Sequence, residues 1–248
     1  MLLILIFITI AVSYIGAYSL EKSFLKYSFF IDSPTERSSH KNSTPTAGGL
    51  SILLAYFFYV YLLLAFHESL IPWYDGHQEY TQNPFFILIA VLSPIMIIGL
   101  IDDFKEANPG IRLLVQFFSA SLIIYYFQVS NDIFELEKQT SQSALMIIII
   151  SIILSMWLMN LYNFMDGIDG YASSECIFVS FSAAVLAYIN NPDSIVSLCI
   201  GGLGVANIGF LVRNWNPAKI FMGDTGSTSI GCILAFLMFY SASESILS

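Results

Sequence analysis

The 248-residue sequence is poor in charge. Only 11% of its residues are Asp, Glu, Lys or Arg, against a usual fraction of about 25%. So few charged groups cannot cover the surface of a water-soluble globule. Hydrophobic residues make up 56% of the chain. The composition therefore excludes a disordered chain and indicates a polytopic membrane protein.

Basic residues and cysteines are also scarce. Nine Lys and Arg stand against eighteen Asp and Glu, and the net charge of −9 argues against nucleic-acid binding. The three cysteines lie in apolar runs, and no two of them have the C-x-x-C spacing of a metal or redox site. We therefore expect Cys176, Cys199 and Cys232 to be structural thiols within membrane helices.

Long apolar runs make up most of the sequence. Eight of them, each close to the length of a membrane-spanning helix, are separated by short polar loops. They lack the alternation of barrel strands, so we expect α-helices. The predicted fold is an all-α, polytopic transmembrane helix bundle, with a single membrane domain over residues 1–248. The runs cover residues 2–20, 47–66, 84–101, 111–129, 144–162, 172–189, 195–212 and 220–240.

The few basic residues set the expected orientation. Eight of the nine Lys and Arg lie in odd-numbered loops, and only Lys138 lies in an even-numbered one. The positive-inside rule then places the odd loops in the cytoplasm and the N-terminus outside. The first apolar run has no basic residue before it and no clear cleavage site after it, so we expect an uncleaved anchor. These features predict a multi-pass inner-membrane protein.

The first and third loops carry groups that suit an anion or a cation. Arg37, His40 and Lys41 can donate to an anion, although a basic stretch that touches anionic lipid is the simpler interpretation. Asp102 and Asp103 end a long apolar run, where the helix terminus is itself partly negative. A divalent cation such as Mg²⁺ would compensate that charge; a solvated acid pair is the alternative.

The fifth loop places polar residues at a spacing of three. Asn163, Asp166 and Asp169 would share one face if the helix continued through them, but Gly167 and Gly170 indicate that it breaks there. Such a polar stripe predicts either a seam between helices or a cavity for a ligand.

The seventh loop contributes Asn214 and Asp224. Asp224 lies between glycines before an apolar run, and a structural N-cap is an alternative to a ligand role. Together the odd loops bring five aspartates, asparagines and several cations to one membrane face. Carboxylates for Mg²⁺ and basic side chains for phosphate oxygens are typical of phosphoryl transfer.

Four motifs resemble those of the polyprenyl-phosphate N-acetylhexosamine-1-phosphate transferases. This family includes the phospho-N-acetylmuramoyl-pentapeptide translocase of peptidoglycan synthesis and the initiators of O-antigen and common-antigen synthesis. The resemblance covers nearly the whole chain. The Asp-x-Pro-x-x-Arg-x-x-His form of the first loop is more similar to the antigen initiators, which serve lipopolysaccharide biosynthesis. The motifs are DSPTERSSHKNSTPTAGG, GLIDDF, NLYNFMDGIDG and NWNPAKIFMGDTGS.

The resemblance implies a reaction. The phosphate of a polyprenyl (undecaprenyl) phosphate attacks the β-phosphate of a UDP-N-acetylhexosamine, and UMP leaves. The product is a lipid-linked sugar diphosphate that starts cell-envelope polysaccharide synthesis. Mg²⁺ is the implied cofactor, with Mn²⁺ as an alternative. The sugar implied is N-acetylglucosamine or a related deoxy-N-acetylhexosamine.

The resemblance also implies roles for individual residues. Asp224 matches the principal Mg²⁺ ligand, and Asp102 and Asp103 match the acidic pair beside it, so these three are the predicted catalytic and metal residues. For the pair we favour positioning over general-base work, because a phosphomonoester near neutral pH needs little deprotonation. The predicted substrate-binding residues are Arg37, His40, Lys41, Arg112, Asn163, Asp166, Asp169 and Asn214.

Two further hypotheses belong to other functional classes. Family members usually have more helices and a later cytoplasmic loop, which we expect this chain to lack. A catalytically inactive homologue that binds nucleotide sugar or lipid phosphate is therefore an alternative. A transporter would need ionisable residues near the bilayer midplane, and the centres of the apolar runs have almost none. The sequence leaves open the sugar, the pathway and whether the protein forms a homodimer.

Overall fold

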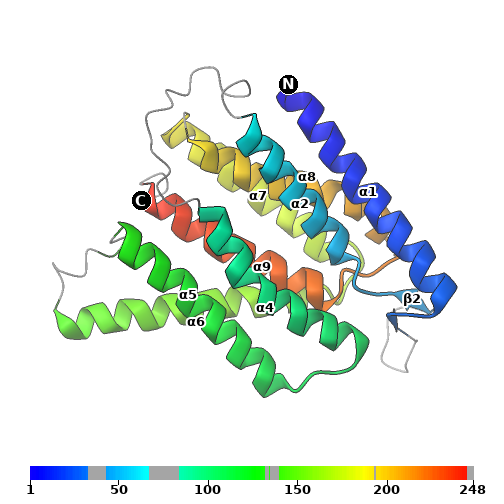
Figure 1. Ribbon diagram of the computed structural model, residues 1–248, viewed down its shortest axis with the longest axis horizontal. Helices are drawn as coiled ribbons and strands as arrows, with labels where there is room; N and C mark the ends of the chain where they lie inside the picture. The colour runs from blue at the N-terminus through cyan, green and yellow to red at the C-terminus, as the bar shows by residue number, and fades with distance from the viewer. Residues whose placement is uncertain (33–42, 67–83, 132–133, 135–139, 193, 245–248) are drawn as a thin grey trace.

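The computed structural model describes residues 1–32, 43–66, 84–131, 134, 140–192 and 194–244. In these parts the chain forms a bundle of long helices (Figure 1). Their bounds are α1 Leu2–Tyr27, α2 Gly49–Ala65, α4 Pro84–Phe104, α5 Pro109–Asn131, α6 Ser141–Met165, α7 Tyr171–Asn190, α8 Ile195–Asn214 and α9 Gly223–Ser243.

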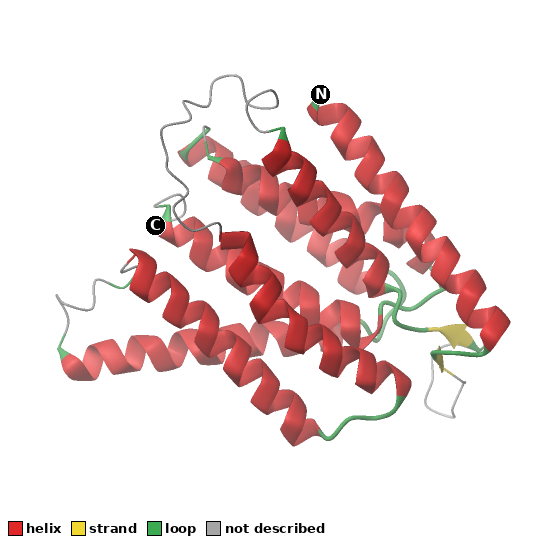
Figure 2. Cartoon of the chain, viewed as in Figure 1, coloured by secondary structure: helices red, strands yellow, loops and turns green. Residues whose placement is uncertain are grey.

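Two very short strands accompany the helices. β1 (Ile31–Asp32) pairs antiparallel with β2 (Thr44–Pro45), with Ile31 opposite Pro45 (Figure 2). Hydropathy does not predict this pair, because two residues are too few to form a pattern. The pairing holds the segment before α2 against the end of α1.

All eight predicted apolar runs are helices. Seven are long and apolar enough to cross a membrane, while α2 is a shorter apolar helix of 17 residues. The predicted polytopic helical fold is therefore confirmed. The largest difference is at α1, which continues to Tyr27 rather than ending at residue 20. Its two added turns carry charged side chains but are held in place, because Glu21 forms a buried ion pair with Arg213 of α8.

The helix α9 lies at the centre of the bundle (Figure 1). Of its most apolar 18-residue window 89% is buried, whereas the corresponding value for α6 is 17%. Neighbouring helices approach α9 closely where glycines face one another. A Cβ built on Gly49 of α2 would lie 2.1 Å from the Cα of Gly226. Close packing of this kind fixes the start of α9 against α2, as small residues do between membrane helices.

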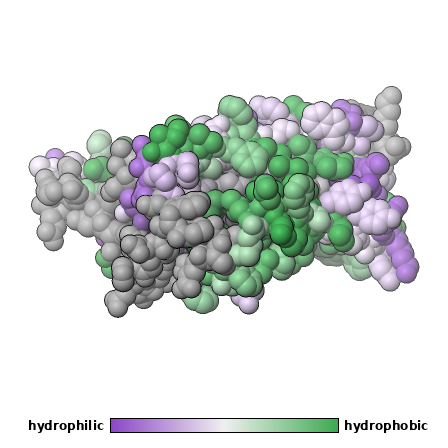
Figure 3. Space-filling model, turned by 90° about the horizontal axis from the view of Figure 1, so that it is seen from above, coloured by the Kyte–Doolittle hydropathy of each residue, from purple (hydrophilic) through white to green (hydrophobic). Residues whose placement is uncertain are grey.

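The surface has the polarity of a membrane protein. On the face drawn in Figure 3, a central apolar band separates hydrophilic regions at the two ends. The outer helices expose large apolar side chains, among them Phe7 of α1 and Ile153 of α6. Such exposure is unfavourable in water and appropriate in lipid. As predicted, Cys176, Cys199 and Cys232 are free thiols within the buried core.

Candidate active site

Three helix ends meet around Arg112. This residue lies in the first turn of α5, and its Nη1 is 2.6 Å from Oδ2 of Asp102 at the end of α4. The same Nη1 is 2.8 Å from Oδ2 of Asp224 in the first turn of α9. Two carboxylates predicted to act together therefore share one guanidinium.

A fourth helix joins this cluster through Asn163. Arg112 Nη2 donates a hydrogen bond to Oδ1 of Asn163 at 3.2 Å. The amide nitrogen of Asn163 donates in turn to Oδ1 of Asp224 at 2.7 Å. Because α6 continues to Met165, Asn163 stands on its last turn and faces α9. The predicted polar stripe thus forms part of a side-chain network that joins α4, α5, α6 and α9.

One oxygen of Asp224 is paired with a charge but has no hydrogen bond within the described part of the chain. Its Oδ2 is buried and accepts no hydrogen bond from the described residues; its contact with Arg112 is an ion pair only. A buried carboxylate oxygen without a hydrogen bond is costly unless a charge compensates it. No group of three or more His, Cys, Asp or Glu side chains in the described parts has the arrangement of a metal cluster. Mg²⁺ needs only one or two carboxylates, so the donor set fits it.

Asp103 holds the start of α9. Its Oδ1 accepts the backbone N–H of Asp224 at 2.7 Å. Its Oδ2 accepts the backbone N–H of Thr225 at 3.0 Å and the Thr225 hydroxyl at 2.6 Å. These N–H groups have no partner within a helix, and a carboxylate also suits the positive helix N-terminus.

The geometry at Gly223 makes this contact feasible. Gly223 has a φ of +76°, and a Cβ there would lie 2.6 Å from Oδ1 of Asp103. Only glycine suits such a position. The alternative interpretation of Asp224 as a helix N-cap is wrong, because Met222 occupies the N-cap and Asp224 lies inside the first turn.

Asp166 and Asp169 contact the loop that leads to α9. α6 ends at Met165, so the break expected from the two glycines is confirmed. Asp166 accepts the backbone N–H of Gly223 at 3.0 Å, and Asp169 accepts that of Ala218 at 2.9 Å. Burial raises the pKa of the Asp166 carboxyl well above its usual range, although the hydrogen bond from Gly223 opposes this shift.

Asn214 is buried at the end of α8. Its side-chain oxygen accepts the backbone N–H of Gly170, and its amide nitrogen donates to the carbonyl of Ile220, both at 3.0 Å. These contacts join two loops of the site, and a contact of Asn214 with ligand stays a prediction. The predicted anion-binding residues Arg37, His40 and Lys41 lie outside the described residues.

Sequence reasoning missed a buried ion pair beside the site. Arg213 donates two hydrogen bonds to Glu21 of α1, the Nε bond at 2.9 Å, and its guanidinium lies over the Tyr18 ring. From the sequence, Arg213 counts only as one of the eight basic residues of the odd-numbered loops, which set the expected orientation. The signal available in the sequence was an acidic residue among the basic residues after the first apolar run.

Comparison with known proteins identifies the family of the chain. Residues 85–242 match the model of Glycosyl transferase family 4, which is more than half of the chain. The chain belongs to this family. The family resemblance seen in the motifs is therefore confirmed, as is the prediction of a multi-pass inner-membrane protein.

The curated relatives are longer than this chain. The chain is 28% identical to the phospho-N-acetylmuramoyl-pentapeptide-transferase of Staphylococcus carnosus (strain TM300), over 79% of this chain and 61% of that protein. It is 29% identical to the protein of the same name from Streptococcus pneumoniae (strain CGSP14), over 79% of this chain and 59% of that protein. The chain thus spans about three fifths of the length of these relatives.

Proposed function

We propose that the protein transfers an N-acetylhexosamine-1-phosphate from a UDP-sugar to polyprenyl phosphate at the cytoplasmic membrane face, releasing UMP. The observation that carries this proposal is the cluster in which Arg112 contacts both Asp102 and Asp224. A site of carboxylates and a guanidinium suits a metal and a diphosphate together. Membership of Glycosyl transferase family 4 supports an enzyme of this class.

The reaction forms one phosphoanhydride bond and breaks another at the same phosphorus atom. An oxygen of the lipid phosphate forms a bond to the β-phosphorus of the UDP-sugar, and the bond from that phosphorus to UMP breaks. Mg²⁺, held by Asp224 and Asp102, would supply charge neutralisation on the diphosphate. Arg112 would bind a phosphate oxygen with a planar, bidentate guanidinium.

Asn163 and Asp103 hold Asp224 in its position. Asn163 orients Asp224 through a hydrogen bond, and Asp103 fixes the helix turn that carries it. Asp103 accepts hydrogen bonds from the turn that carries Asp224, so we assign it to positioning that turn. The oxygens of Asp102 also accept hydrogen bonds, from Ala107 and Arg112, but Asp102 shares Arg112 with Asp224 and so stands beside it. Catalysis then depends on orientation and electrostatic stabilisation, which is the expected division of work in phosphoryl transfer.

Two predictions compete for the identity of the transferred sugar. The relatives are named for a phospho-N-acetylmuramoyl-pentapeptide group. The form of the first loop instead favours UDP-N-acetylglucosamine or a related deoxy-N-acetylhexosamine. We propose the latter class, because the Asp-x-Pro-x-x-Arg-x-x-His form of the first loop is more similar to the antigen initiators.

A label-transfer assay tests the activity and the sugar together. Purified protein with polyprenyl phosphate and Mg²⁺ is given each of a panel of labelled UDP-N-acetylhexosamines, including the muramoyl-pentapeptide derivative. UMP release and label in the lipid fraction are measured. We expect transfer from UDP-N-acetylglucosamine or a related sugar. Asp224→Asn should lower the rate by about 100-fold or more.

Glu106→Gln is the matched control. Glu106 is an exposed carboxylate in the loop after α4, and we expect the rate to change less than two-fold, about the effect of a surface substitution. An unchanged rate in Asp224→Asn would contradict the metal role of Asp224.

An inactive homologue is the second candidate. It is motivated by the chain spanning about three fifths of the length of its relatives. This alternative expects UDP-sugar or lipid phosphate to bind without release of UMP. Turnover by the purified 248-residue protein would exclude it.

A further inference from the structure

A large apolar groove lies between α1, α2 and α4, apart from the carboxylate cluster. Its volume is about 1150 Å³, larger than most pockets for small molecules. All three helices contribute lining residues. Its lining is aliphatic and aromatic, and includes Val12, Ile15, Leu53, Phe57, Ile89 and Met96. A groove of this composition at membrane depth suits hydrocarbon chains.

The groove and the guanidinium of Arg112 lie on different sides of α4, although Asp103, fourteen residues after Ile89, falls on the groove side. Asp102 is thirteen residues beyond the groove-lining Ile89, which places it about 140° around the helix. In agreement, Asp102 contacts Arg112 of α5, whereas α5 contributes no residue to the groove. A lipid in the groove would therefore present its phosphate away from Arg112. This geometry argues against the lipid substrate as the occupant.

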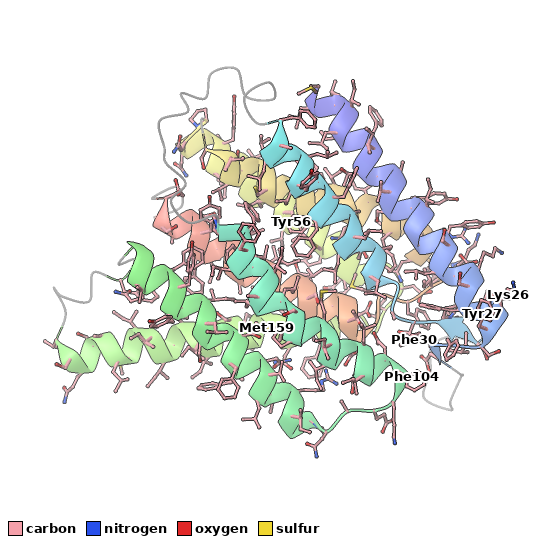
Figure 4. The ribbon with its side chains drawn as sticks, viewed as in Figure 1. Lys26, Tyr27, Phe30, Tyr56, Phe104 and Met159 are labelled. Atoms are coloured by element: carbon pink, nitrogen blue, oxygen red, sulfur yellow. The ribbon has the colours of Figure 1, made fainter. Side chains whose placement is uncertain are left out.

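Aromatic rings pack together where α1 and α4 both terminate, beyond the groove-lining residues of these helices. The rings of Phe30, just after α1, and Phe104, the last residue of α4, pack edge to face at 5.7 Å. Phe24 packs on Phe30 at 5.0 Å. Figure 4 shows Phe30 and Phe104 together at this end, with Lys26 and Tyr27 beside them. Aromatic rings at this depth are typical of the membrane interface.

Two lysines follow the groove face of α1. Lys22 and Lys26 come seven residues, or about two turns, after the groove-lining Ile15 and Ser19. Both ammonium groups are exposed. Within the described part of the chain, Lys22 lies 4.0 Å from Glu21, whose carboxylate is already paired with Arg213. The two lysines therefore place positive charge just beyond the groove-lining part of α1, at the predicted cytoplasmic end.

We propose that this groove binds an anionic phospholipid of the bilayer, with its acyl chains along α1, α2 and α4 and its phosphate beside Lys22 and Lys26. Charge complementarity with these lysines selects the headgroup. A lysine close to an anionic lipid contributes about a five-fold preference. The site is independent of the proposed transfer reaction, because it uses none of the carboxylate cluster.

Native mass spectrometry of the full chain tests the site. The protein is reconstituted in vesicles of equimolar phosphatidylcholine and phosphatidylglycerol, extracted in mild detergent, and the retained lipid is counted. We expect retained phosphatidylglycerol to exceed phosphatidylcholine by about ten-fold or more. The double variant Lys22→Gln/Lys26→Gln should abolish this preference. The control Lys219→Gln removes one exposed cytoplasmic charge elsewhere and should retain it.

Two further measurements separate the site from a folding defect. Ile89→Trp fills the groove at a half-exposed lining residue and should lower retention of both lipids without changing the charge of the two lysines. High salt should weaken the headgroup preference of the unaltered protein. Equal retention of the two lipids, or a preference that survives the double variant, would overturn the proposal. So would preferential retention of added polyprenyl phosphate that Ile89→Trp removes.

Discussion

Asp103 determines where Asp224 stands, although the two residues are 121 positions apart. Its carboxylate accepts two backbone N–H groups and one hydroxyl at the start of α9. We predict that Asp103→Asn lowers the stability of the protein by about 1–2 kcal/mol, as the loss of a helix cap does. Thermal unfolding in detergent measures this change.

A double-mutant cycle checks the mechanism of that loss. Thr225→Val removes the hydroxyl that Asp103 accepts and keeps the shape of the side chain. If the two side chains act through one contact, the effects should be non-additive by about 0.5–3 kcal/mol. Strictly additive effects would contradict the assignment of Asp103 to positioning.

At Arg112, a positive charge alone cannot make the contacts that the structure shows. Its guanidinium reaches Asp102, Asp224 and Asn163 at the same time. An ammonium group is a point charge and cannot span three partners in a plane. We predict that Arg112→Lys lowers the rate of UMP release by about ten-fold or more while the melting temperature falls only slightly. A variant with the parent rate would show that only the charge matters.

At the scale of elements, the contact between α2 and α9 depends on two glycines that face each other. We predict that Gly49→Ala destabilises the protein by about 1–3 kcal/mol, because the new methyl group meets the backbone at Gly226. Gly201→Ala is the matched control, since its Cβ would meet only the Ala184 Cβ at an ordinary 3.6 Å. Thermal unfolding of both variants compares them; equal effects would contradict the close approach.

The ion pair between Glu21 of α1 and Arg213 of α8 is the second contact between helices that we expect to stabilise the bundle. Glu21→Gln leaves the Arg213 guanidinium without its buried partner, and we predict a loss of about 3–5 kcal/mol. Lys22→Gln, which alters the neighbouring exposed charge, should change stability by less than about 1 kcal/mol. Melting temperatures of the two variants measure the difference, and similar values would show that the pair contributes little.

Helices were predictable from the sequence because each is one long apolar run, and the hydrocarbon core sets its length. Their polar ends were not, since the extension of α1 from Glu21 to Tyr27 depends on Arg213, 192 residues from Glu21. The motifs identified Asp102, Asp103 and Asp224 as site residues. The motifs could not show how the two side chains differ: Asp103 accepts hydrogen bonds from the backbone of α9, while Asp224 has a buried oxygen without a hydrogen bond from the described residues. This difference depends on how α4 and α9 pack.

At the scale of the whole molecule, the buried native thiols permit a direct test of orientation. All three cysteines are fully buried, so an introduced thiol can be labelled without background. With the predicted N-terminus outside, Asn190→Cys at the end of α7 should react with a membrane-impermeant maleimide in intact cells. Glu106→Cys, after α4, should react only once the membrane is opened. The reverse pattern would contradict the positive-inside assignment.

The burial of α9 also has a consequence for evolution and engineering. The helix that begins with Asp224 is the same helix that fills the centre of the bundle, so the position of this carboxylate is tied to the packing of nearly every other helix. Substitutions that relocate it would have to rebuild the core. Under the proposed function, a change of sugar preference should therefore accumulate in the loops predicted to be cytoplasmic, and a library aimed at new donors is best confined to those loops while α9 is left unaltered.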